Sequence, residues 1–126
     1  MTSTTFNLGD WLIFEPSHQK ADKWQALKVL EEASEVVEAA KQTINANTVQ
    51  TDQAAPARKK LTNEIADLLQ TIVNLCDAFD ITEPDLVAAQ YDCEHKNLDR
   101  GMFEPTPRTH MHREDPATNT GKEQEA

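Results

Sequence analysis

The sequence predicts an all-α protein that folds as an antiparallel helical bundle. Three long segments carry apolar residues at the three- and four-residue spacing that is typical of one face of a helix. Only three Gly occur among the 126 residues, and no glycine-rich phosphate loop is present. Polar capping residues precede two of the segments, so the pattern indicates separate helices joined by loops.

The first long helix is expected to begin at Asp22. Asp is a favourable N-cap residue, and Gln25 follows three residues later, as in a capping box. The apolar face is broad, which suits a helix that packs on more than one neighbour. This face comprises Trp24, Leu27, Leu30, Val37 and Ile44, with Val29, Ala33, Val36 and Ala40 beside them.

The second helix is expected from Pro56 to about Asp80, after a polar linker over residues 45–55. It is the most apolar element of the chain. Glu64 nevertheless lies among leucines, with Leu68 one turn later, and a carboxylate there is costly unless it is paired or binds a metal. The other polar side chains follow a separate line, made of Asn63, Asp67, Gln70, Asn74 and Asp77.

A third helix is expected from Thr82 to about Gly101. Thr82 is a suitable N-cap, Pro84 falls in the first turn, and Asp85 stands at the capping-box position. Gly101 is the predicted stop, because glycine readily adopts the left-handed conformation that ends many helices.

One domain is expected over residues 10–103. Residues 1–9 are predicted to be a flexible N-terminus, and residues 104–126 a disordered or loosely packed tail. Two neighbouring helices cannot easily cover a helix as apolar as the second one. We therefore expect a four-helix core that is completed by oligomerisation, as a homodimer or homotetramer.

Composition limits the partners of the chain. The net charge of −10 argues against a nucleic acid polymer, whose binding needs clustered Lys and Arg. No apolar run is long enough for a membrane span, and no signal peptide is visible. Cys76 and Cys93 lie outside any Cys-x-x-Cys motif, which favours reduced thiols in a cytoplasmic protein.

Two pairs of acidic residues carry the strongest chemical signal. Glu32 and Glu35 lie three residues apart in the first helix, and Glu64 and Asp67 have the same spacing in the second. Residues at this spacing are neighbours on a helix surface, where like charges repel. Two helices that bring such pairs together need a cation between them, and four carboxylates suit a hard divalent ion such as Mg²⁺, with Mn²⁺ as the alternative.

This pattern, Glu31-Glu32-x-x-Glu35 followed by Glu64-x-x-Asp67, resembles the all-α nucleoside triphosphate pyrophosphohydrolases of the MazG-like superfamily. That superfamily includes dimeric dUTPases, dCTP pyrophosphatases and phosphoribosyl-ATP pyrophosphohydrolases. The resemblance covers roughly residues 10–103. A third segment, Lys96-Asn97-x-x-Arg100-Gly101, is similar to a segment that follows the metal helices in many small, phage-like members.

The resemblance implies hydrolysis of a nucleoside triphosphate, including deoxynucleotides, to the monophosphate and pyrophosphate by a metal-activated water. It implies that Glu31 is an outer ligand or orients a water, and that Glu35 is catalytic as well as a ligand. The implied Mg²⁺ ligands are Glu32, Glu35, Glu64 and Asp67. The implied phosphate contacts are Lys96, Asn97 and Arg100, and the implied contacts to the base are Trp11 and Phe14.

Each candidate also has a structural alternative. The first acidic pair, taken alone, could belong to a solvated helix face, as Glu38 is expected to do. Lys96 and Arg100 could complement the dipole at a helix C-terminus. The aromatic residues could pack in the core or at a dimer interface, and Lys28 could be the ion-pair partner of Glu32.

The four His residues do not form a convincing ligand set. They are His18, His95, His110 and His112, and the last two fall in the tail, where they are expected to be incidental, apart from some affinity for Zn²⁺ or Ni²⁺. Two other functions stay open at this point. One is a catalytically silent nucleotide-binding or regulatory helical oligomer of the same fold, and the other is a purely structural helical dimer with solvated carboxylates.

Overall fold

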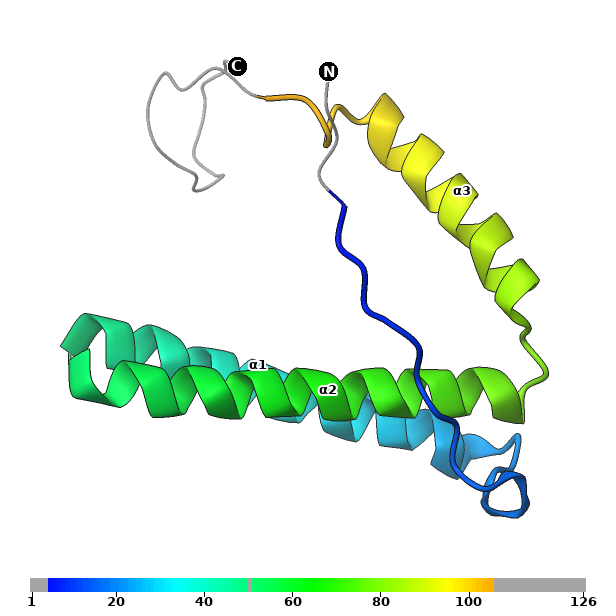
Figure 1. The fold of residues 1–126 in the computed structure, drawn as a ribbon, viewed down its shortest axis with the longest axis horizontal. Coiled ribbons are helices and arrows are strands. Elements are labelled where there is room, and N and C mark those ends of the chain that lie inside the picture. Colours follow the sequence, from blue (N-terminus) through cyan, green and yellow to red (C-terminus); the bar gives the residue numbers. More distant parts are fainter. Residues whose placement is uncertain (1–4, 50, 106–126) are drawn as a thin grey trace. The chain divides into compact units, whose positions relative to one another are not determined.

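The computed structural model describes residues 5–49 and 51–105, and this part of the chain is helical without any strand (Figure 1). The prediction of an all-α fold is therefore confirmed. The three long helices are α1 (Lys23–Val49), α2 (Ala54–Ala78) and α3 (Glu83–Asp99). Two short 3₁₀ helices, η1 (Pro16–His18) and η2 (Thr51–Gln53), precede α1 and α2.

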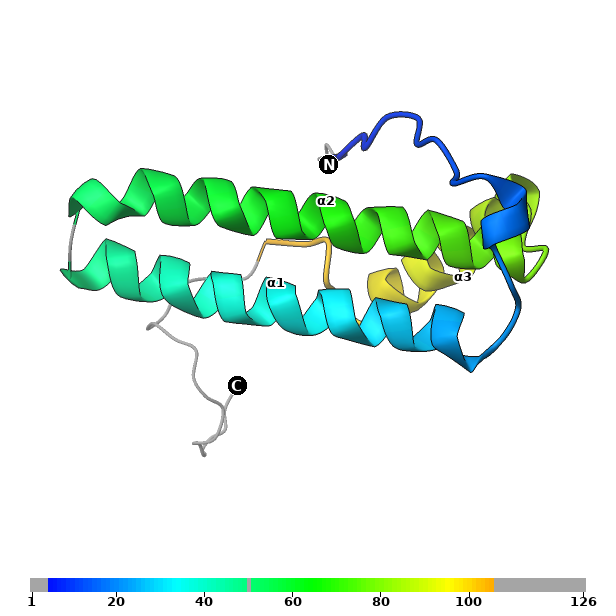
Figure 2. The same ribbon diagram turned by 90° about the horizontal axis from the view of Figure 1, so that it is seen from below.

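The chain divides into two units, of which one ends at Tyr91 and the other begins at Asp92. The first unit contains α1 and α2, which pack side by side along their lengths as an antiparallel hairpin (Figures 1 and 2). Ala39 of α1 is fully buried in this unit, where a small side chain lets the helix backbones approach each other. The hairpin is the scaffold on which both acidic pairs stand.

The loop between α1 and α2 is shorter than the predicted linker over residues 45–55, and that prediction was wrong. Helix α1 continues to Val49, and α2 already begins at Ala54, so that Pro56 is its third residue. Residues 45–49 contain no Gly or Pro, and packing against α2 can hold them helical despite weak periodicity. The Thr43 hydroxyl donates to the Ala39 carbonyl (2.9 Å) and to the Ala57 carbonyl of α2 (3.3 Å), which joins the two helices here.

One of the two contacts of the predicted capping box at the start of α1 is present. The Asp22 carboxylate accepts hydrogen bonds from the backbone N–H groups of Trp24 (3.1 Å) and Gln25 (3.2 Å). The second contact was predicted between the Gln25 side chain and the Asp22 N–H, and this prediction was wrong. The Gln25 side chain accepts from the Lys20 N–H instead. The Asp22 N–H already donates to the Lys20 carbonyl at 2.9 Å, so it is not free to close the box.

Helix α3 begins with the complete capping box that the sequence predicts. The Thr82 N–H donates to the Asp85 carboxylate (2.9 Å), and the Asp85 N–H donates to the Thr82 hydroxyl oxygen (3.2 Å). These hydrogen bonds, the backbone one first, lower the pKa of Asp85. At the other end of α3, Gly101 has φ +73°, as expected for the residue that stops the helix.

An extended N-terminal segment lies on α2, held by two amide side chains of that helix. Gln70 donates from Nε2 to the Leu12 carbonyl (2.8 Å) and to Asn74 Oδ1 (3.1 Å). Asn74 Oδ1 in turn accepts from the Phe14 N–H (3.1 Å), and the Asn74 side chain is buried, with 4% exposed. Both amides belong to the polar line that also contains Asp67, so the segment is fixed close to the second acidic pair.

Large apolar side chains stay exposed on the single chain. The predicted apolar face of α1 is among them, and Ala39 is the one buried apolar residue in the described part of the chain. An exposed stripe of this size is typical of a surface that another chain covers. The exposed members on α1 are Trp24, Leu27, Leu30, Val37 and Ile44.

None of the described helices combines the length and the apolar character that crossing a membrane requires. Both cysteines, Cys76 and Cys93, are free. The domain limits at residues 10 and 103 stay predictions, and most of the predicted tail, with His110 and His112, lies outside the described residues.

Candidate metal centre

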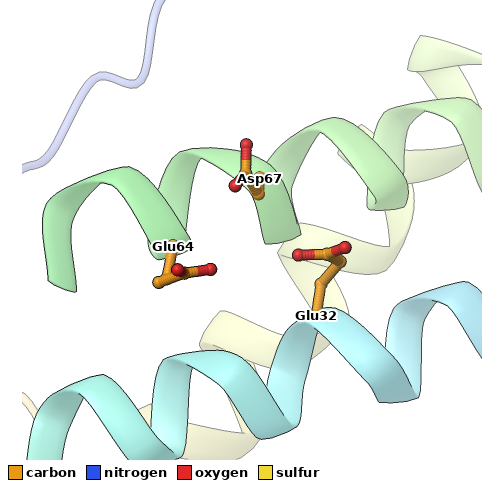
Figure 3. A group of neighbouring side chains, drawn as sticks. All are labelled: Glu32, Glu64 and Asp67. Atoms are coloured by element: carbon orange, nitrogen blue, oxygen red, sulfur yellow. The ribbon is translucent and has the colours of Figure 1, made fainter. Parts of the chain in front are cut away.

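Three carboxylates from the two helices of the hairpin converge at its middle. Glu32 projects from α1, and Glu64 and Asp67 project from α2 (Figure 3). One carboxylate oxygen from each residue lies within 4.8 Å of the corresponding oxygens of the other two. The antiparallel packing thus brings together side chains that lie more than thirty residues apart in the sequence.

The burial of the three carboxylates differs. The side chains of Glu32 and Glu64 are largely covered, with 16% and 17% exposed, whereas Asp67 is exposed. Partial burial weakens the screening that water would give to three like charges. Such a group is destabilising by itself, and it favours a bound cation.

Lysines stand one helical turn before both glutamates. Lys28 Nζ lies 3.5 Å from Glu32 Oε2 and 3.2 Å from Glu31 Oε1, and Lys60 Nζ lies 3.8 Å from Glu64 Oε2. The ion pair between Lys28 and Glu32 was predicted and is confirmed. The hydrogen bond and the charge of Glu31, followed by the charge of Glu32, raise the pKa of Lys28. Lys60 was missed, although its four-residue spacing from Glu64 was a sufficient signal.

Glu35, the fourth predicted ligand, is not part of this group. Its side chain is exposed on α1, one turn beyond Glu32. Glu31 is also exposed and pairs with Lys28. The structure therefore gathers three of the four predicted ligands and leaves both predicted catalytic glutamates at the surface.

The predicted phosphate contacts stand together at the C-terminal end of α3, in the second unit. Arg100 Nη1 donates to Asn97 Oδ1 (3.3 Å), and Asn97 Nδ2 lies 3.5 Å from the sulfur of Cys93. Lys96 is in the last turn of α3, and its carbonyl accepts from the Arg100 N–H (3.2 Å). The Asn97 and Arg100 side chains thus contact each other, and the contact of all three residues with phosphate stays a prediction.

The two aromatic residues predicted to contact the base belong to the extended N-terminal segment. Trp11 is half-buried, and its indole Nε1 donates to the Leu8 carbonyl (3.1 Å). Phe14 is exposed, while its N–H is held by Asn74. Sequence reasoning did not assign a role to Gln70 or Asn74, and the polar line that contains them was the only signal.

Comparison with known protein families gave a match over most of the described helices. The family described as Phosphoribosyl-ATP pyrophosphohydrolase matches residues 13–92, which is more than half of the chain. The matched range contains the three converging carboxylates and ends before Lys96. No curated protein and no solved structure gave a match.

The family match confirms the resemblance that the acidic motifs suggested, and it indicates a pyrophosphohydrolase. The chain belongs to the phosphoribosyl-ATP pyrophosphohydrolase family, within the MazG-like all-α nucleoside triphosphate pyrophosphohydrolase superfamily.

Proposed function

We propose that the protein hydrolyses a nucleoside triphosphate, or a deoxynucleoside triphosphate, to the monophosphate and pyrophosphate with the help of Mg²⁺. One observation carries the proposal. Glu32, Glu64 and Asp67 converge to within 4.8 Å inside the segment that matches a pyrophosphohydrolase family. Either helix alone would supply only an acidic surface.

The chemistry of this group suits a hard divalent cation. All three donors are carboxylate oxygens, which Mg²⁺ and Mn²⁺ prefer over the nitrogen and sulfur donors that favour zinc. Three side chains from a protein leave further coordination positions for water and for substrate oxygens. When bound, the ion would lower the pKa of a water molecule and offset negative charge on the phosphate oxygens.

Other residues of the chain have proposed roles in the same reaction. Glu35 is the proposed fourth ligand and a catalytic residue, because it completes the acidic motif of α1 one turn after Glu32. Glu31, held by Lys28, is proposed to orient the attacking water. The phosphate contacts are proposed to be Lys96, Asn97 and Arg100, and the contacts to the base Trp11 and Phe14.

The substrate and the assembly complete the proposal. The family description places phosphoribosyl-ATP among the nucleotides to be tested, beside the standard and deoxy nucleoside triphosphates. We propose a homodimer or homotetramer, because the exposed apolar stripe of α1 is suited to a four-helix core. The two free thiols are compatible with the cytoplasm as the proposed compartment.

Pyrophosphate release from a panel of nucleotides, measured with and without Mg²⁺, tests the activity. We expect Glu32→Gln, Glu35→Gln and Asp67→Asn each to lower kcat/KM at least about a hundredfold, because a ligand of the ion loses its charge. Glu38→Gln is the matched control, since Glu38 is an exposed glutamate of α1 that pairs with Lys41 outside the carboxylate group.

Mg²⁺ should also raise the melting temperature of the wild-type protein, because a ligand that binds only the folded state stabilises it. No turnover of any triphosphate would contradict the proposal. Nucleotide binding without pyrophosphate release would instead select the catalytically silent oligomer. Full activity of Glu35→Gln would remove Glu35 alone from the proposed site.

A further inference from the structure

Both helices of the hairpin place a lysine against a carboxylate of the candidate metal centre. Lys28 pairs with Glu32 at 3.5 Å and Lys60 pairs with Glu64 at 3.8 Å, each from one turn earlier on its own helix. The lysine side chains are 53% and 51% exposed. An ion pair with a half-exposed ammonium group at 3.5 Å or more is weak, so each lysine can exchange its partner at low cost.

The two lysines flank the carboxylate group from opposite ends. Each precedes its glutamate by four residues, a rise of about 6 Å along the helix axis. Because α1 and α2 run antiparallel, these displacements point in opposite directions (Figures 1 and 2). A metal ion held by Glu32, Glu64 and Asp67 would therefore have one lysine on each side along the hairpin.

The charges of the lysines match the charge of the expected ion. Three carboxylates carry three negative charges, and the two ammonium groups offset two of them, as one divalent cation would. The lysines and the ion thus compete for the same oxygens. Once the ion is bound, it repels the ammonium groups, and phosphate oxygens become their best partners.

Lys28 also borders open space near the N-terminus of α1. It lines an open pocket of about 270 Å³ at the start of α1, together with His18, Lys20, Asp22, Trp24 and Gln25. An ammonium group that leaves Glu32 can therefore turn toward this open pocket, whose lining also includes Lys20.

We propose that Lys28 and Lys60 are exchangeable counterions of the metal centre. In the metal-free protein they hold the carboxylates together, and in the loaded protein they bind phosphate oxygens of the nucleotide on either side of the ion. This inference rests on the proposed function, and it adds two substrate-binding residues to it.

The test compares Lys28→Met and Lys60→Met with Lys41→Met. Lys41 is a matched control, since it forms an exposed ion pair with Glu38 on α1, 3.8 Å long and outside the carboxylate group. Binding of Mn²⁺ alone is measured by electron paramagnetic resonance. We expect each of the two test variants to bind Mn²⁺ about two- to fivefold more tightly than wild type, because a competing cation has been removed.

Steady-state kinetics supply the second readout. We expect KM for the metal–nucleotide to rise about tenfold in Lys28→Met and in Lys60→Met, because a charge-assisted phosphate contact is lost. Lys41→Met should change neither quantity. Lys28→Arg and Lys60→Arg keep the positive charge and should return KM towards the wild-type value.

The Met substitutions are expected to strengthen Mn²⁺ binding and to weaken nucleotide binding. This combination distinguishes exchangeable counterions from lysines that only support the fold. If the Met variants lose Mn²⁺ affinity together with substrate affinity, the lysines only support the fold of the site, and the inference is overturned. If Lys28→Met and Lys60→Met behave like Lys41→Met, the counterion inference is overturned while the proposed function stands. A wild-type protein that binds no Mn²⁺ would remove both proposals.

Discussion

At the scale of single residues, the backbone around Asp80 shows how the hairpin ends. Asp80 has φ +58°, the one left-handed conformation of a non-glycine residue in the described part of the chain. Its N–H donates to the Asp77 carbonyl (3.2 Å), and the Ile81 N–H donates to the Cys76 carbonyl (2.8 Å). These two bonds form a Schellman motif, which fixes where α2 stops.

Asp80→Gly should stabilise the protein. Glycine adopts the left-handed conformation without the steric penalty of a Cβ atom, so we expect the free energy of unfolding to rise by about 0.5–1 kcal/mol. Urea denaturation followed by circular dichroism measures this change. Asp80→Ala is the control, because it removes the carboxylate but keeps the Cβ, and it should not stabilise. A loss of stability in Asp80→Gly would mean that the carboxylate, and not the backbone, matters here.

At the scale of the helical elements, the caps were predictable because they depend on residues within one turn. Asp22, Thr82, Asp85 and Gly101 each act where the sequence placed them. The error at Gln25 arose because a neighbouring carbonyl, that of Lys20, had already taken the Asp22 N–H. Local rules identify donors and acceptors, but they do not identify which of two nearby partners is chosen.

The capping box of α3 should make the stability of that helix dependent on pH. The folded-state pKa of Asp85 is lowered, so its contribution is fully present above the unfolded pKa of about 3.9 and is lost as the pH falls through the folded pKa. We therefore expect wild type and Asp85→Ala to differ in urea midpoint at pH 6 and to converge as the pH approaches about 2.

Glu83→Ala is the control for this pH effect. It removes an acidic side chain from the same first turn and leaves the hydrogen bonds between Thr82 and Asp85 in place. A difference between wild type and Asp85→Ala that stays constant from pH 6 to pH 2 would contradict the assignment.

Contacts between elements were harder to predict than the elements themselves. Gln70 and Asn74 bind the backbone of Leu12 and Phe14, which lie about sixty residues away in the sequence. A pattern within one segment cannot predict a contact between segments so far apart. The convergence of Glu32 with the second acidic pair depends on the register of the α1–α2 hairpin. The spacing within each pair was visible in the sequence, whereas their meeting was expected only from the family resemblance.

At the scale of the whole molecule, the stripe that the sequence predicts as the apolar face of α1 is not buried within one chain. Leu30, Val37 and Ile44 recur every seven residues and all three are exposed. A seven-residue spacing keeps side chains on one side of a helix, as at the centre of a four-helix bundle. The oligomer that would cover them stays a prediction.

Val37→Asp should therefore weaken self-association without unfolding the hairpin. A carboxylate buried without a partner costs about 3 kcal/mol, which weakens association about a hundredfold. Sedimentation velocity over a range of protein concentrations measures this shift. Gln42→Asp is the control, because it adds the same charge to an exposed position of α1 outside the stripe. A wild-type protein that sediments as a monomer at all concentrations would contradict the expectation.

The hydrogen bonds that Gln70 and Asn74 form with the N-terminal segment determine which substitutions that segment tolerates. Both amides hold main-chain atoms, the Leu12 carbonyl and the Phe14 N–H, and neither reads a side chain. Sequence drift at positions 12–14 therefore leaves the attachment intact, with proline at position 14 as the exception because it lacks the N–H. The side chains of this segment can therefore change, and with them what the segment contacts, while α2 with Glu64 and Asp67 stays the same.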